Sequence, residues 1–144
     1  MSSDKFNYKL NFYDAFTKYT ESLRYNDELI FLGGDYNIAP EDIDVYDAQH
    51  LEQSTCFTIQ ERQKLRPIMN EGWLDAYRLM QAQQSEFTWW DYRGNGFAHN
   101  KGMRIDHILL NPRSADHLSG CIIDQDTRKL PKSSDHAPFI CEFS

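Results

Sequence analysis

Three short polar motifs lie in or directly after apolar, β-like runs of this chain, and they constrain its fold more than any other feature. They are Asp35-Tyr36-Asn37, Arg104-Ile105-Asp106-His107 and Ser133-Ser134-Asp135-His136. In open α/β sheets, functional side chains collect at strand ends, where a rigid scaffold holds the loops. We therefore expect a fold in which strands bring these distant motifs to one place.

The order of predicted elements indicates an α/β fold. Apolar residues recur at three- and four-residue spacing from about Asn7 to Arg24, which predicts an amphipathic helix. The apolar run from Leu29 to Leu32, closed by two glycines, predicts a short buried strand. Residues 35–47 are acidic without periodicity and predict a loop.

The second part of the chain adds one helix and several strands. The capping-box pattern from Thr58 to Glu61 predicts a helix start, and Pro67 is expected to kink or shorten that helix. Further strands are predicted over residues 87–92, 104–110, 120–123 and 137–143, with a Gly/Asn-rich loop over 93–102.

Size and composition fit one domain without a membrane segment. The chain has 144 residues, of which 40% are apolar and 26% charged, as in ordinary globular proteins. No apolar run approaches the ~20 residues that cross a bilayer, and the N-terminus lacks a hydrophobic signal segment. Three widely spaced cysteines argue against a disulfide framework or zinc site and favour a reducing, cytoplasmic setting.

The net charge gives only weak evidence on whether the protein binds nucleic acid. A net charge of −7 argues mildly against it, because separate DNA-binding domains are usually basic. Carboxylates clustered around a metal are an exception, because the ion screens them. Arg93, His99, Lys101 and Arg104 lie close together in sequence and form either a local phosphate contact or a solvated loop.

The first motif is a D-x-N pair, Asp35 and Asn37. If residue 36 is extended, both side chains point the same way and can share one water or phosphate. The alternative is an Asx turn, because Asp and Asn both favour turns.

Asp106 is a charged residue inside an apolar strand. A buried carboxylate is costly unless it is paired, and a histidine whose ring it orients is the natural partner. The alternative is a surface-facing strand position. His107 points to the opposite face and is expected to be structural or solvent-facing.

The third motif offers Asp135 and His136 on adjacent residues. They either face opposite sides of a strand or both reach a site from the preceding turn. The alternative is a polar turn before an edge strand marked by Pro138.

Together these side chains suit metal-assisted hydrolysis of a phosphodiester. Carboxylates hold a hard cation or orient a water, and a protonated histidine and an Asn amide donate to phosphate oxygens. Trp89 is either a packing residue or the wall of a pocket for a base-less nucleotide. Asn100 is either a turn residue or a phosphate contact.

Three segments resemble the exonuclease III branch of the endonuclease/exonuclease/phosphatase superfamily. They are FLGGDYNIAPEDIDVYD (31–47), FTWWDYRGNGFAHNKGMRIDHILLNP (87–112) and KSSDHAPF (132–139). The segments KFNYKLNFYDAF (5–16) and ERQKLRPIMNEGWLDAYR (61–78) fit the same pattern. NIAPEDIDVYD and TWWDYR are typical of the DNA-repair branch rather than the lipid and inositol phosphatases.

This resemblance implies a fold and an activity. The fold is half of a four-layer α/β sandwich of the DNase I-like type, with mostly antiparallel or mixed sheet and helices on one face. The activity is Mg²⁺- or Mn²⁺-dependent hydrolysis of DNA as a 3′→5′ exonuclease and abasic-site endonuclease. A superfamily relative acting on lipid or inositol phosphates is the alternative within the same class.

The resemblance also implies site roles. Asp35, Asn37, Asp106 and His136 would be catalytic, with His136 oriented by Asp106. Asp135 would help to place the metal ion, with Asp35 and Asn37 in the same ligand set. The residues implied in DNA binding are Trp89, Arg93, Asn100, Lys101, Met103 and Arg104, of which Met103 replaces a second pocket Trp of many relatives.

The N-terminal half of the family's complete enzymes, with its metal-ligating Glu, has no counterpart here. We therefore expect residues 1–144 to be a C-terminal half. Half a sandwich would expose an apolar sheet face, so the chain is expected to self-associate or to need the missing half. Alone it is expected to bind Mg²⁺ weakly and cleave little DNA, and a non-catalytic or split-protein fragment is the alternative of a different class.

Overall fold

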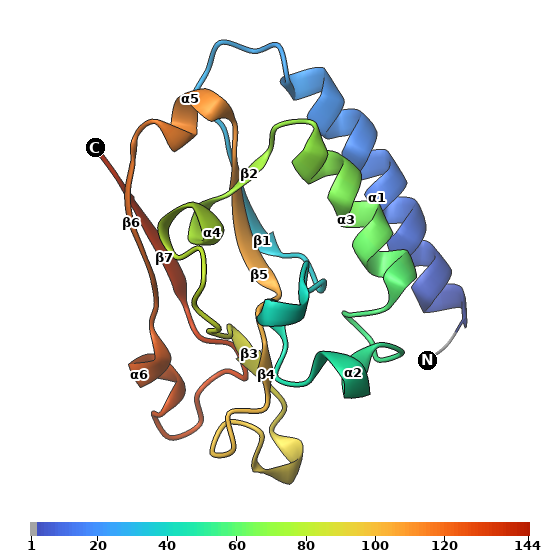
Figure 1. Cartoon of the computed structure of the whole chain (residues 1–144), viewed down its shortest axis with the longest axis vertical. Helices are drawn as coiled ribbons and strands as arrows, with labels where there is room; N and C mark the ends of the chain where they lie inside the picture. Colours follow the sequence, from blue (N-terminus) through green and yellow to red (C-terminus); the bar gives the residue numbers. More distant parts are fainter. Residues whose placement is uncertain (1–2) are drawn as a thin grey trace.

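The computed structural model describes residues 3–144 as helices and small antiparallel sheets (Figure 1). In chain order the elements are α1 (Ser3–Leu23), β1 (Phe31–Asp35), η1 (Asp42–Asp44), α2 (Ala48–Leu51), α3 (Ile59–Asn70), β2 (Leu74–Asp75), α4 (Ala76–Met80), β3 (Trp89–Trp90), η2 (Arg93–Asn95), β4 (Gly102–Met103), β5 (Asp106–Leu110), α5 (Pro112–Ala115), β6 (Leu118–Ile123), α6 (Gln125–Arg128) and β7 (Phe139–Phe143). The predicted α/β class is confirmed.

Of the two long helices, α3 begins where local chemistry favours a start. α1 begins earlier than predicted and buries Tyr13 and Thr20. At the start of α3, the Thr58 hydroxyl accepts from the Glu61 N–H at 3.3 Å, and the Glu61 carboxylate accepts from the Thr58 N–H at 3.0 Å. This is the predicted capping box. Pro67 lies inside α3, which runs on to Asn70.

Strands pair antiparallel throughout, in three groups ordered β1-β5-β2, β3-β4 and β6-β7. The prediction of a buried strand over Leu29–Leu32 is wrong in position and burial. β1 runs from Phe31 to Asp35 with both glycines inside it, and four of its five residues are exposed. It pairs only with β5 among the described strands, so one edge and part of one face remain open to solvent.

β5 separates two packed layers because its side chains alternate between its faces. Leu109 lies in the cluster packed under α1 and α3, whereas Leu110 lies in the cluster that contains Cys121 of β6. The ring of Phe31 in β1 also packs edge to face against the ring of Phe143 in β7, with their centroids 4.5 Å apart. The helices therefore cover one face of the central sheet, and the β6-β7 hairpin covers the other (Figure 1).

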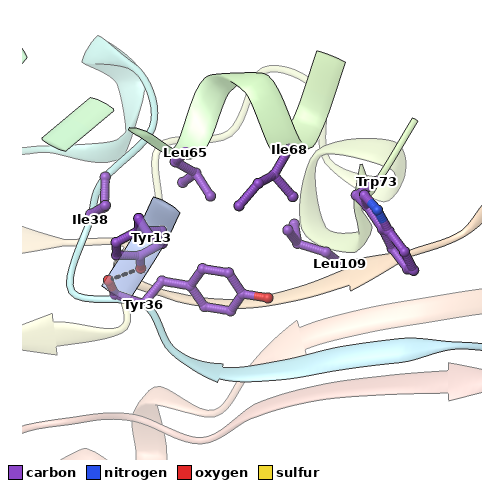
Figure 2. Packing of buried hydrophobic residues seen from close by; sticks show 7 residues of the cluster. All are labelled: Tyr13, Tyr36, Ile38, Leu65, Ile68, Trp73 and Leu109. Carbon is purple, nitrogen blue, oxygen red and sulfur yellow. Dashed lines mark hydrogen bonds between the residues drawn. The ribbon is translucent and has the colours of Figure 1, made fainter. Parts of the chain in front are cut away.

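The core under the helices fixes the segment that follows β1 (Figure 2). The Tyr13 hydroxyl of α1 donates to the backbone carbonyl of Tyr36. Burial raises the pKa of Tyr13 well above its usual range, so the phenol remains a donor. The seven clustered residues are Tyr13, Tyr36, Ile38, Leu65, Ile68, Trp73 and Leu109.

The outer face of the β6-β7 hairpin exposes two isoleucines, and Glu142 lies on the same face. Ile122 and Ile140 are directly opposite in register and are 59% and 43% exposed. Within residues 3–144, each helix is too short or too polar to cross a membrane.

Candidate active site

The structure brings Asp35, Asp106 and His136 together. The Nδ1 atom of His136 lies 2.8 Å from Asp106 Oδ2, and its Nε2 atom lies 3.8 Å from Asp35 Oδ2. Asp35 ends β1, Asp106 begins β5 directly opposite it, and His136 precedes β7. One ligand atom from each residue lies within 4.8 Å of the others, which makes them a possible metal-binding group.

The D-x-N motif forms an Asx turn and also presents Asp35 to the site. Asp35 Oδ1 accepts the Asn37 N–H at 2.9 Å, as in an Asx turn, while Oδ2 faces His136. Asn37 has a φ of 52°, a left-handed conformation that Asn tolerates well. Lys9 Nζ of α1 donates to the Asn37 carbonyl at 2.5 Å and so ties this turn to the helix.

The imidazole of His136 is oriented by Asp106. Asp106 accepts from Nδ1–H, which leaves Nε2 facing Asp35 and the solvent. The backbone N–H of His136 donates to Ser134 Oγ at 3.1 Å, which fixes the turn before β7. The side chains of Asp35 and His136 are 39% and 30% exposed, so both can be reached from outside.

Asp135 lies beside this group, not within it. Its Oδ2 atom accepts the Trp89 indole N–H at 3.0 Å, and its carbonyl accepts the Trp90 N–H at 3.1 Å. The two residues of the third motif thus diverge: His136 turns to the carboxylates and Asp135 turns to Trp89.

A surface pocket of about 820 Å³ adjoins the site. Its lining includes six of the predicted residues, namely Asn37, Trp89, Arg93, Met103, Asp135 and His136. Asn100 and Lys101 lie on the exposed loop after η2, and Asn100 Oδ1 accepts the Trp90 indole N–H at 3.1 Å. The Arg93 side chain is 91% exposed and pairs with Asp91 at 2.7 Å.

The structure buries Arg104, whereas the sequence predicted it among the exposed DNA-binding residues. Its side chain is 1% exposed, with NH2 2.6 Å from Asp75 Oδ2 and Nε 2.7 Å from Asp44 Oδ1. Burial would lower the pKa of Arg104, but the two carboxylates outweigh it and raise that pKa. The guanidinium is therefore an internal cation that joins the loop before β5 to η1 and β2.

His107 belongs to the same buried network. Of the two predicted alternatives, structural or solvent-facing, it is structural. An Arg104 nitrogen lies 3.2 Å from His107 Nδ1, and His107 Nε2 lies 2.7 Å from the Ile38 carbonyl. Because arginine only donates, we assign the neutral tautomer with its proton on Nε2. Burial and the adjacent Arg104 lower the pKa of His107, in agreement with that assignment.

The sequence pattern missed one wall of the pocket. Residues 53–56 line it from the irregular stretch between α2 and α3, where neither periodicity nor a motif marks them. Burial raises the pKa of the Cys56 thiol to about 11. This thiol is therefore protonated at neutral pH and is not the nucleophile of the site.

The geometry has a defined chemical capacity. An imidazole held between two carboxylates can carry a proton at Nε2 and donate it to an anionic oxygen in the pocket. The exposed Asp35 oxygen can accept a proton from a water or hold a cation. Packed antiparallel sheets with a carboxylate–imidazole centre at their strand ends define an α/β protein with groups suited to general acid–base chemistry.

The comparisons name the group. The sequence profile of the endonuclease/exonuclease/phosphatase family matches residues 1–136. The chain belongs to this family.

Three similar proteins define the branch. Exodeoxyribonuclease III of Haemophilus influenzae is 35% identical over 146 residues, which cover 96% of this chain and 55% of the relative. A 3′ phosphatase from Neisseria, solved with a product DNA hairpin, is 35% identical with a TM-score of 0.93 over 99% of this chain and 56% of its own. An AP endonuclease from Archaeoglobus fulgidus is 31% identical with a TM-score of 0.92, over 99% and 56%. The chain spans little more than half the length of each.

Proposed function

We propose that this chain is the C-terminal half of a DNA-repair nuclease that hydrolyses phosphodiesters as a 3′→5′ exonuclease and abasic-site endonuclease. One observation carries the proposal: His136 lies between Asp106 and Asp35 beside a pocket lined by Trp89. The relatives named above act on DNA, which supports the substrate class.

Each side chain has a role in this proposal. Asp106 holds the Nδ1–H of His136, so that Nε2–H points outward and offsets charge on a phosphate oxygen. Asp35 positions or deprotonates the attacking water. Asn37 adds an amide beside the same phosphate, because it lines the same pocket.

We further propose Mg²⁺, or Mn²⁺, as the cofactor. The donors fit a hard cation in kind, because Asn37 and Asp135 supply an amide and a carboxylate oxygen in the pocket, and Asp35 supplies a carboxylate beside His136. Asp135 keeps free lone pairs beyond its bond from Trp89. Mg²⁺ is commonly held by one or two carboxylates and several waters. These three residues therefore provide suitable ligand types, and we expect their affinity for Mg²⁺ to be low. When bound, the cation would neutralise phosphate charge and lower the pKa of a bound water.

DNA is the proposed partner, as an abasic-site duplex or a 3′ end. Trp89 and Met103 line the pocket and offer apolar contact to a base-less sugar. Arg93 and Lys101 are exposed and offer charge to phosphates, and Asn100 offers an amide.

A complementary half completes the proposal. The chain spans 55% of its Haemophilus relative, and Ile122 and Ile140 are exposed on the outer face of the β6-β7 hairpin. We propose that a missing N-terminal half, or failing that self-association, covers this face. A cytoplasmic setting belongs to the same proposal and is supported by three free cysteines.

The test is cleavage of an abasic-site duplex with Mg²⁺. The chain is assayed alone and mixed with the part of Haemophilus exodeoxyribonuclease III that it does not cover. We expect little activity alone and cleavage on mixing, lost in Asp35→Ala and His136→Ala but kept in the exposed control His50→Ala.

Two outcomes would replace the proposal. Release of phosphate from a phosphoinositide, without cleavage of the abasic duplex, would assign the lipid or inositol branch. A folded mixture that cleaves neither substrate would assign an inert fragment.

A further inference from the structure

The chain changes sheets between β4 and β5, immediately before the proposed catalytic Asp106. β4 ends at Met103 and pairs with β3, whereas β5 begins at Asp106 and pairs with β1 and β2. At such a crossing the regular ladder of hydrogen bonds is interrupted, and buried backbone N–H groups need other partners. The N–H groups of Ile105 and Asp106 are two such groups.

One side chain satisfies both of them. Thr88 Oγ1 accepts from the Ile105 N–H at 3.0 Å and from the Asp106 N–H at 3.1 Å. The same hydroxyl lies 3.5 Å from the Met103 carbonyl, to which it can donate. Thr88 is fully buried at 0% exposure, so water cannot replace these contacts.

The backbone of Thr88 reaches the second proposed catalytic residue. Its carbonyl accepts the Ala137 N–H at 2.7 Å, and its N–H donates to the Met103 carbonyl at 2.9 Å. Ala137 directly follows His136, and Trp89 forms a β-bridge to His136. Thr88 therefore touches the strand start that carries Asp106 and the turn that carries His136.

We propose that Thr88 is a positioning residue that sets the Asp106 carboxylate against His136 Nδ1. The inference rests on the proposed function for its catalytic meaning, but its geometry does not depend on metal or substrate. An oxygen is required at this place because two consecutive N–H groups converge on it, and a methyl group of equal size offers no acceptor.

The test uses NMR of the metal-free 144-residue chain, so it is independent of nuclease activity. Thr88→Val removes the acceptor at constant shape, and Thr88→Ser keeps it. Thr20→Val is the matched control, because Thr20 is equally buried and its hydroxyl donates to Thr17 in α1, which is remote in sequence from the site residues. Asp106→Asn supplies the reference for a broken pair.

Two signals are measured. We expect the amides of Ile105 and Asp106 to exchange about tenfold faster in Thr88→Val, because each loses a buried acceptor. We expect the ring nitrogen resonances of His136 in this variant to move toward those of Asp106→Asn. Thr88→Ser and Thr20→Val are expected to retain the wild-type His136 resonances, even where Thr20→Val lowers stability.

The opposite results would overturn the proposal. A folded Thr88→Val chain with wild-type His136 resonances would show that the hydroxyl only stabilises the fold. If Thr88→Val does not fold, Thr88→Cys takes its place, because sulfur is a weak acceptor. His136 resonances in Thr88→Cys that match Thr88→Ser would equally overturn the proposal, and a shift toward Asp106→Asn would support it.

Discussion

The Nδ1 atom of His136 lies 2.8 Å from the Oδ2 atom of Asp106, although the two residues are 30 positions apart in sequence. Because Nδ1 is taken by Asp106, the opposite ring nitrogen, Nε2, faces Asp35 Oδ2 at 3.8 Å. That second distance exceeds a hydrogen bond but suits an ion pair. An anionic oxygen or a water entering from the pocket would meet Nε2, the ring nitrogen that does not bond to Asp106.

Asp106→Asn should lower kcat of the reconstituted enzyme about 10²- to 10⁴-fold, because an amide cannot stabilise a charged imidazole. Cleavage rates on an abasic-site duplex at saturating substrate measure the effect. Asp116→Asn, an exposed acid elsewhere, should leave kcat unchanged. Equal rates for both variants would remove Asp106 from the mechanism.

Trp89→Phe should weaken Mn²⁺ binding about 10-fold, because residues that orient a metal ligand contribute about 10- to 100-fold to affinity. The variant keeps an aromatic ring but loses the N–H that holds Asp135 at 3.0 Å. Trp90→Phe is the matched control, since it loses an indole N–H that reaches Asn100 instead. Electron paramagnetic resonance titration measures free Mn²⁺, and identical affinities would separate Trp89 from the metal.

Arg104→Met should cost about 3–5 kcal/mol of the free energy of unfolding, because Asp75 and Asp44 then lose a buried cation. Lys64→Met, which breaks a partly exposed pair with Asp14, should cost about 0–1 kcal/mol. Urea denaturation measures both values. If Arg104→Met changed the free energy of unfolding only slightly and lowered the salt dependence of DNA binding, Arg104 would be a surface DNA contact and not a buried ion-pair partner.

Stability should fall with acid through Asp75. Burial alone would raise the pKa of Asp75, but the paired Arg104 outweighs it and holds that pKa below its usual 3.8. Between 3.8 and this lower value the unfolded chain binds a proton that the folded chain does not. The ionised Asp75 therefore contributes its full stabilisation of the fold above pH 3.8, and this stabilisation is lost as pH falls through the folded-state pKa of Asp75.

Asp75→Asn isolates this effect. The variant should be less stable at pH 7 but should lose less additional stability below pH 3.8, as measured by urea unfolding across pH. Asp116→Asn, whose carboxylate is exposed, should keep the wild-type slope. Parallel slopes in Asp75→Asn and the wild type would contradict a lowered pKa.

The wild-type chain should self-associate in sedimentation velocity at tens of micromolar, because its hairpin exposes apolar side chains. Ile122→Lys with Ile140→Lys should shift the distribution toward monomer. Leu79→Lys with Met80→Lys, at exposed positions elsewhere, should not. A wild-type monomer at every concentration would show that the open face is tolerated in solution.

Local patterns were sufficient for several elements. The capping box at Thr58, the apolar spacing of α1 and the strand before Asn111 all depend on neighbours within a few positions. The position of β1 was not predictable in this way. The two glycines look like a strand end, but pairing with β5 carries the strand through them to Asp35.

The sequence by itself determined which chemical groups the site would hold: carboxylates, an amide and an imidazole at the ends of strands. Only the tertiary structure decided their assignments. Arg104 is internal because Asp44 and Asp75 surround it, Asp135 accepts a hydrogen bond from the Trp89 indole, and Thr88 meets two N–H groups where the chain changes sheets. Burial and hydrogen-bond partners depend on which strands cross, and residues far apart in sequence specify that jointly.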